Sequence, residues 1–237
     1  MRRVVLVTGA NRGIGREVVR QVVAAGDVAL LSARNVDHAR TEADLEEQAA
    51  AAAGTGGQVE VVPLDVADPA SVERAARQVD ERHGRVDAIV NNAAIHYDTW
   101  QRGVDADLGV VTKAFETNVL GAWRVTQAFL PLLRRSAHPR VVNVSSQGGS
   151  LASMGGGTPA YSVTKAALNA LTRVLAAELR ADGVLVNAIC PGWTATDMGG
   201  RGGRPVRDGA ASVMWAINLP DDGPTGGFFR DGRPLPW

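Results

Sequence analysis

The stretch Val4-Val5-Leu6-Val7-Thr8-Gly9-Ala10-Asn11-Arg12-Gly13-Ile14-Gly15 joins a short apolar run to a glycine-rich turn. The residues that follow are apolar at helical spacing, at Val18, Val19, Val22 and Val23. Glycines between a strand and a helix let the backbone approach a phosphate, which the start of the helix attracts. The stretch therefore predicts a dinucleotide-binding unit, with a tight turn that binds nothing as the alternative.

Apolar runs alternate with helical patterns along the rest of the chain. The further strands are expected at residues 28–31, 58–64, 86–90, 140–144 and 184–189, with a last edge strand near 227–229. The further helices are expected at about residues 37–53, 69–84, 107–135, 159–181 and 207–218. Continuous apolar strands that alternate with helices are typical of a parallel sheet covered on both faces. We therefore predict an α/β protein with one doubly wound (Rossmann) parallel sheet and helices on both faces, in a single domain over residues 1–237.

Composition limits the classes of partner. Lys and Arg together number 25, as do Asp and Glu, so the formal net charge is zero, which argues against nucleic acid or an anionic membrane as the partner. The single cysteine, Cys190, excludes an internal disulfide, and no ligand stands at metal-binding spacing from His96, so no metal site is predicted. No apolar stretch is long enough for a secretory signal or a membrane span, which predicts a cytoplasmic protein.

Tyr161 and Lys165 stand four residues apart in the expected helix, so their side chains share one face. The chain has only two tyrosines, and only Lys113 and Lys165 among its 25 basic residues are lysines. A nearby cation lowers the pKa of a phenol from its usual value of about 10, which lets a tyrosine transfer protons near neutral pH. The pattern predicts such a pair, with a core tyrosine beside a solvated lysine as the alternative.

Two arginines follow the first two expected strands. In dinucleotide-binding folds an acid after the second strand holds the ribose 2′-hydroxyl, whereas an arginine there suits a 2′-phosphate. Here the second strand ends at Ser32-Ala33-Arg34 without an acid, and Arg12 stands in the glycine-rich turn. Because arginine can bind phosphate through two parallel hydrogen bonds, we predict NADP(H) in preference to NAD(H). Two solvated arginines are the alternative.

Large side chains follow the expected strands 86–90 and 184–189. They are His96, Tyr97, Trp100, Trp193 and Met198. Ligands bind beyond the carboxyl ends of the strands in doubly wound sheets. These residues therefore predict an apolar substrate pocket with aromatic walls, and aromatic residues scattered through the core are the alternative.

In their order along the chain, these motifs resemble the short-chain dehydrogenase/reductase family over essentially the full length. The matching residues are the turn from Thr8 to Gly15, Asp65, Asn91-Asn92-Ala93, Asn118, Ser146, Tyr161-xxx-Lys165 and Pro191-Gly192-xxx-Thr196. The run from Cys190 to Met198 and the C-terminal Phe-Arg-Asp-Gly-Arg are most similar to the carbonyl-reductase branch. Monomeric members of that branch carry a long insertion before the catalytic tyrosine. This chain lacks the insertion, because Ser146 and Tyr161 stand close together in the sequence. The resemblance therefore leaves a homodimer or a homotetramer open as the oligomeric state.

The resemblance implies NADPH-dependent reduction of a ketone or aldehyde carbonyl to an alcohol, or the reverse oxidation. Tyr161 would be the general acid or base, and Ser146 would hydrogen-bond the substrate oxygen, with Ser145 as the alternative. Lys165 would lower the pKa of Tyr161 and hold the ribose hydroxyls. Asn118 would bind a water that passes protons to Lys165, and an ordinary helical residue is the alternative for it.

The resemblance also implies the cofactor contacts. Asp65 would accept a hydrogen bond from the adenine amino group, with a cap or turn residue as the alternative, and Val66 would pack on the ring. The turn from Asn91 to Ala93 would lie beside the adenosine ribose. The implied set is Gly9, Asn11, Arg12, Gly13, Ile14, Gly15, Arg34, Asp65, Val66, Asn91, Asn92, Ala93, Tyr161, Lys165, Pro191, Gly192, Thr194 and Thr196.

Two other functions fit the sequence. A 3-ketoacyl-thioester reductase of the same family would need a basic entrance for the phosphopantetheine of a carrier. A non-catalytic NADP(H)-binding sensor or scaffold would commonly lack the tyrosine or the lysine, and both Tyr161 and Lys165 are present.

Overall fold

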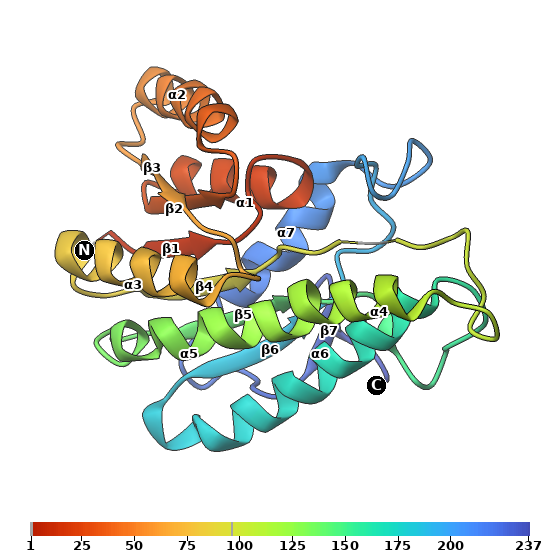
Figure 1. The fold of residues 1–237 in the computed structure, drawn as a ribbon. Helices are drawn as coiled ribbons and strands as arrows, with labels where there is room; N and C mark the ends of the chain where they lie inside the picture. Colours follow the sequence, from red (N-terminus) through yellow and green to blue (C-terminus); the bar gives the residue numbers. More distant parts are fainter. Residues whose placement is uncertain (1, 96) are drawn as a thin grey trace.

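In the computed structural model, which describes residues 2–95 and 97–237, an eight-stranded sheet lies between two layers of helices (Figure 1). The strands are β1 (Val4–Val7), β2 (Val28–Ala33), β3 (Gln58–Pro63), β4 (Ala88–Asn91), β5 (Arg140–Val144), β6 (Leu185–Ile189), β7 (Phe228–Arg230) and β8 (Arg233–Pro234). Their order is β3-β2-β1-β4-β5-β6-β7-β8, and the pairs from β3 to β7 are parallel. The doubly wound parallel sheet is thus confirmed.

The end of the sheet differs from the prediction. The strand expected as the edge near 227–229 is β7, which pairs with β6 on one side and with β8 on the other. The turn between β7 and β8 holds Asp231 at φ 51° and Gly232 at φ 74°. Two consecutive residues with positive φ are typical of a tight hairpin, so the chain folds back and β8 becomes the edge.

The helices form one layer on each face of the sheet. The first layer contains α1 (Gly13–Ala24), α2 (Val36–Ala53) and α7 (Val206–Ile217), and the second contains α3 (Pro69–His83), α5 (Ala122–Leu133) and α6 (Pro159–Glu178), with α4 (Leu108–Phe115) extending α5 (Figure 1). Each layer closes its own apolar core, with Val18 and Val213 in the first and Phe129 and Leu168 in the second. Both faces of the central strands are therefore buried, as their continuous apolar sequences predict.

Local signals set several helix ends. Asp68 accepts a hydrogen bond from the Ala70 N–H at 3.0 Å, and Gly84 ends α3 in the left-handed conformation at φ 69°. A capping carboxylate, a proline in the first turn and a terminal glycine therefore set the two ends of this helix.

The long helical stretch expected at about 107–135 is present at 108–133, but its middle is a π-helical segment, η1 (Glu116–Gly121), which separates α4 from α5. Contacts from outside the helix coincide with this segment. A Cβ on Gly121 would lie 2.7 Å from Cγ2 of Val66, and the Asn118 side chain bonds the backbone of Ile95. Such wider turns occur mostly as single insertions in α-helices, and frequently at functional sites.

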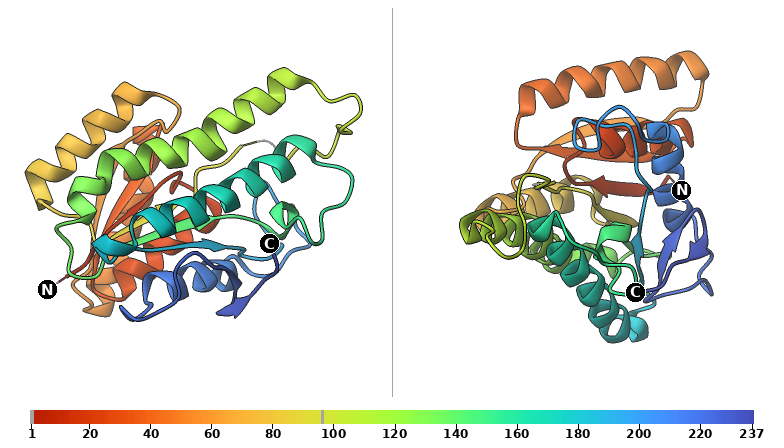
Figure 2. Two further views of the ribbon diagram at one scale, coloured as in Figure 1. Left: turned by 90° about the horizontal axis from the view of Figure 1, so that it is seen from below. Right: turned by 90° about the vertical axis from the view of Figure 1, so that its right-hand side faces the viewer.

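The loops that follow β4 and β6 project at the same edge of the sheet, on the right-hand side of Figure 1, and face the viewer in the right panel of Figure 2. The strand order reverses at β1, which pairs with β2 on one side and β4 on the other. This is the place where doubly wound sheets bind ligands. In the part of the chain that the structure describes, no helix combines the length and apolarity that a membrane crossing requires.

Candidate active site

Helix α6 carries Tyr161 and Lys165 one turn apart beside the end of β5. The Lys165 Nζ lies 5.6 Å from the centroid of the Tyr161 ring and donates a hydrogen bond to the Val144 carbonyl at 2.7 Å. Lys165 is only 3% exposed. The predicted pair is therefore together in space, with the amine directed at the main chain of the sheet.

The start of α6 is held by a residue that sequence reasoning missed, Asp98. Its side chain is 0% exposed and accepts hydrogen bonds from the N–H groups of Ala160 at 2.9 Å and Tyr161 at 3.0 Å. Thr158, which precedes the helix, instead bonds the Ser162 hydroxyl. The first N–H groups of a helix lack partners within it and favour a negative charge. A carboxylate from the loop after β4 thus fixes the turn that carries Tyr161.

The two serines at the end of β5 have different surroundings. Ser146 lines the same cavity as Tyr161, and its hydroxyl accepts a hydrogen bond from the Gly148 N–H at 3.1 Å. Ser145 is buried, and its hydroxyl donates to Oδ1 of Asn169 at 2.6 Å. Of the two hydroxyls that the sequence offered, only that of Ser146 reaches the cavity.

Burial controls the protonation of the pair. It raises the pKa of Tyr161 to about 12, against the smaller, lowering effect of the Ser146 hydroxyl. It also lowers the pKa of Lys165 to about 8. The prediction that Lys165 lowers the pKa of Tyr161 is wrong in this structure, because desolvation of the phenol dominates and the amine faces Val144. Near pH 7, Tyr161 is therefore a neutral phenol with a proton to donate.

Lys165 is expected to make the free energy of unfolding rise with pH between about 8 and 10.5, its folded and usual pKa values. Within this window the unfolded chain binds the proton and the folded chain does not, so stability rises by roughly 1 kcal/mol per pH unit. Urea unfolding of the wild type and of Lys165→Met at pH values of about 7.5, 8.5 and 9.5 measures this difference. Parallel pH profiles for the two proteins would contradict the assignment.

The glycine-rich turn after β1 leaves little room for side chains. Gly9 and Gly13 have φ values of 62° and 55°, in the left-handed region that favours glycine. A Cβ on Gly15 would lie 2.5 Å from Nδ2 of Asn92, which donates to the carbonyls of Thr8 at 2.9 Å and Gly9 at 3.1 Å. The Asn92 side chain therefore stabilises the turn by hydrogen bonds to the main-chain carbonyls of Thr8 and Gly9.

The surroundings of this turn fit a dinucleotide. The first turn of α1 contains no acid, and no described side chain caps its first N–H groups, which suits a pyrophosphate. Arg12 lies 3.2 Å from Asp197 in an exposed ion pair. Arg34 is exposed at the end of β2 and has no hydrogen bond or ion pair with any residue in the described ranges. Both cations are thus available to a phosphate near the turn.

Of the other residues predicted to bind the cofactor, some lie at the cleft and others are buried in the core. Asn91 is buried and donates to Thr126 Oγ1 at 3.1 Å and Asn143 Oδ1 at 2.8 Å, so its side chain faces α5 and β5 instead of the cleft. Asp65 accepts from the Ala67 N–H at 3.0 Å, as the turn alternative expects. The residues that stay at the glycine turn or the cavity are Asn11, Ile14, Ala93, Pro191, Gly192, Thr194 and Thr196.

Val66 and Asn118 are both tied into η1. Val66 is buried against Gly121, which leaves little of it for a ligand. Asn118 is also buried, and its amide accepts from the Ile95 N–H at 2.8 Å and donates to the Ile95 carbonyl and to Thr164 Oγ1, each at 3.1 Å. The Asn118 side chain thus joins η1 to the loop after β4 and to α6.

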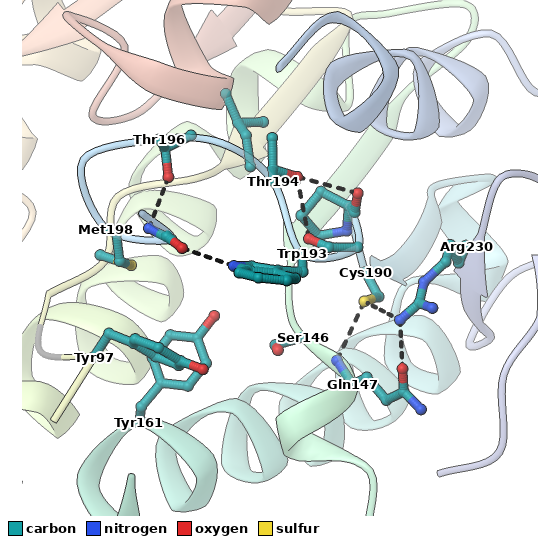
Figure 3. A pocket seen from close by; sticks show the side chains of 14 residues that line it. Tyr97, Ser146, Gln147, Tyr161, Cys190, Trp193, Thr194, Thr196, Met198 and Arg230 are labelled. Carbon is teal, nitrogen blue, oxygen red and sulfur yellow. Dashed lines mark hydrogen bonds between the residues drawn. The ribbon is translucent and has the colours of Figure 1, made fainter. Parts of the chain in front are cut away.

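A cavity of about 260 Å³ opens beyond the ends of β5 and β6 (Figure 3). It is lined by Ile14, Tyr97, Ser146, Gln147, Tyr161, Cys190, Pro191, Gly192, Trp193, Thr194, Thr196, Met198, Gly199 and Arg230. The ring of Tyr97 meets that of Tyr161 edge-on, with centroids 5.0 Å apart. Trp100 is 68% exposed and does not line the cavity, and His96 lies outside the described residues.

Four further lining residues, Gln147, Cys190, Gly199 and Arg230, were missed in the sequence. Gln147 directly follows Ser146, and Cys190 directly precedes Pro191 at the end of β6, so both positions carried a signal. Arg230 stands in the C-terminal Phe-Arg-Asp-Gly-Arg run, but nothing local shows that β7 returns to the cavity.

Comparisons with known proteins agree with this geometry. A family model described as short chain dehydrogenase matches residues 3–204. The oxidoreductase UcpA of Escherichia coli K12 is 36% identical over 195 residues, 81% of this chain and 70% of that protein. A (+)-neomenthol dehydrogenase of Arabidopsis thaliana is 32% identical over 296 residues, covering 96% of this chain and 95% of its own. The crystal structure of NADPH-bound carbonyl reductase from chicken fatty liver has a TM-score of 0.85 and 31% identity, with 100% of both chains covered.

Proposed function

This chain belongs to the short-chain dehydrogenase family, and from this premise we propose that it reduces a ketone or aldehyde to an alcohol with NADPH, or catalyses the reverse oxidation. The observation that carries the proposal is one cavity that contains both the Ser146 hydroxyl and the Tyr161 phenol, with Lys165 one turn further along the same helix.

The proposed chemistry uses the proton of Tyr161. With a pKa of about 12, Tyr161 holds this proton at neutral pH and would donate it to the carbonyl oxygen as an alcohol forms. Ser146 would donate a second hydrogen bond to the same oxygen and stabilise the negative charge that develops there. Lys165, whose pKa lies at about 8, is mostly cationic at pH 7 and adds positive charge behind the phenol. When bound, NADPH supplies the hydride for the carbonyl carbon.

Residues around the glycine-rich turn would hold the cofactor. The first N–H groups of α1 would bind the pyrophosphate, and Arg12 and Arg34 the 2′-phosphate. Lys165 would hold ribose hydroxyls. The proposed proton path would run through a water at Asn118, whose side-chain amide also bonds Ile95 and Thr164.

Replacing Arg34 with aspartate is expected to lower kcat/KM for NADPH by about 10- to 100-fold, because charged hydrogen bonds to the 2′-phosphate are lost. The value for NADH should stay the same or rise, since an acid at this position suits a ribose 2′-hydroxyl. Arg40→Asp, an exposed change of the same charge on α2, is the matched control. Equal losses for both cofactors would argue against a 2′-phosphate contact.

The experiment that tests the function is oxidation of NADPH in the presence of ketones, aldehydes, quinones and ketoacyl thioesters. Turnover of a free ketone or aldehyde supports the proposal. Turnover confined to acetoacetyl thioesters would favour the thioester reductase. Binding of NADPH without turnover of any compound would favour the non-catalytic sensor.

A further inference from the structure

Arg230 brings a charge into the cavity that the proposed reaction does not use. It stands at the end of β7, and among the described residues that line the cavity it is the only charged one. In Figure 3, Ser146 lies between Tyr161 and the Arg230 guanidinium. A substrate whose carbonyl oxygen contacts Ser146 and Tyr161 would therefore have this cation beside it, on the side of Ser146 away from Tyr161.

Most hydrogen-bond donors of Arg230 have no partner among the residues that the structure describes. A guanidinium has five N–H donors. Nη2 donates to Gln147 Oε1 at 2.7 Å and to Cys190 Sγ at 3.1 Å. Nε is buried without an acceptor, and no described residue accepts from Nη1. The two contacts of Nη2 hold the plane of the guanidinium while Nη1 stays available.

The charge of Arg230 is also unbalanced. Arg204 and Arg230 both lie close to Gly192. A Cβ built on Gly192 would lie 3.3 Å from Arg204 Nη1 and 3.9 Å from Arg230 Nε. Arg204 is paired with Asp231, with Nη1 2.9 Å from Oδ2. Asp231 adjoins Arg230 in the chain, yet its carboxylate serves Arg204. No carboxylate of the described residues forms an ion pair with Arg230.

We propose that Arg230 binds a carboxylate of the substrate, so that the preferred substrates are oxo acids. A planar guanidinium suits a carboxylate because both can form two parallel hydrogen bonds. Tyr97, Trp193 and Met198 would contact the hydrocarbon part of the molecule. This inference rests on the proposed function, because it names the substrate class of the same cavity.

The test compares oxo acids with their methyl esters, which keep the carbonyl and remove the charge. The series consists of 2-, 3-, 4- and 5-oxo carboxylates, with wild type, Arg230→Gln, Arg230→Lys and the exposed control Arg233→Gln on β8. In Arg230→Gln, kcat/KM for the best acid should fall by about 10- to 100-fold and that for its ester by less than about threefold. Arg230→Lys should be intermediate, because it keeps the charge and loses the planar fork.

Several outcomes overturn the inference. One is a wild type that prefers the esters, and another is an acid preference that survives in Arg230→Gln. A raised KM for NADPH in that variant would assign Arg230 to the cofactor instead.

If no carbonyl compound is turned over at all, the proposed function fails, and a binding experiment then tests the carboxylate site by itself. In that case 4-oxopentanoate is titrated calorimetrically into protein saturated with NADP+. Binding to the wild type but not to Arg230→Gln supports the site, and equal or absent binding overturns it.

Discussion

Replacing Tyr161 with phenylalanine is expected to lower kcat for carbonyl reduction by about 10²- to 10⁴-fold, the usual contribution of a positioned general acid. The change removes only the phenolic oxygen, so the ring still fills its place against Tyr97 and α6 keeps its start on Asp98. Steady-state kinetics with a reactive ketone give the loss, and fluorescence titration with NADPH shows whether cofactor binding is kept.

The chain offers a matched control for this change. Tyr97→Phe removes the hydroxyl of the other tyrosine in the sequence, whose ring lines the same cavity. We expect its kcat to stay within about threefold of the wild type. Wild-type turnover in Tyr161→Phe would mean that the proton comes from elsewhere and would refute the proposed chemistry.

Replacing Ser146 with alanine is expected to lower kcat by about 10²- to 10³-fold, because a hydrogen-bond donor to the developing oxygen charge is lost. The free energy of unfolding should fall by no more than about 1 kcal/mol, since the Ser146 hydroxyl lines an open cavity and the bond it loses is the one from the Gly148 N–H. Kinetics and urea unfolding of the same preparation measure both quantities.

Ser145→Ala should show the opposite pattern. Its hydroxyl is buried against Asn169, so its loss should lower the free energy of unfolding by about 1–3 kcal/mol and leave kcat nearly unchanged. If Ser145→Ala lost activity and Ser146→Ala lost stability, the catalytic role would pass to Ser145.

Local patterns were sufficient to predict the sheet and most of its helices. The strand at 140–144 has the predicted bounds because its apolar run lies between polar turns, and α3 ends at Gly84 because glycine tolerates the left-handed conformation there. The α6 pair of Tyr161 and Lys165 was predictable for the same reason, since helical spacing alone puts both on one face.

The features that sequence reasoning missed depend on contacts between distant segments. The π-helical η1 lies where Asn118 bonds Ile95 and Gly121 meets Val66, and no periodicity within 107–135 signals either contact. The direction of the Tyr161 pKa shift was wrong because burial, a property of the finished fold, outweighs the nearby amine. Arg230 reaches the cavity only through the pairing of β7 with β6.

The carboxylate of Asp98 has a consequence for enzyme engineering. Loops that follow β4 are natural targets for exchange when a new specificity is wanted, because Tyr97 of this loop borders the cavity. Here the same loop also supplies the acceptor for two N–H groups at the start of α6. A transplanted loop without an acid at this position would leave those two N–H groups unpaired. The position of Tyr161 at the start of α6 would then be less fixed. Chimeras built on this protein should therefore keep an aspartate at the position of Asp98 in the new loop.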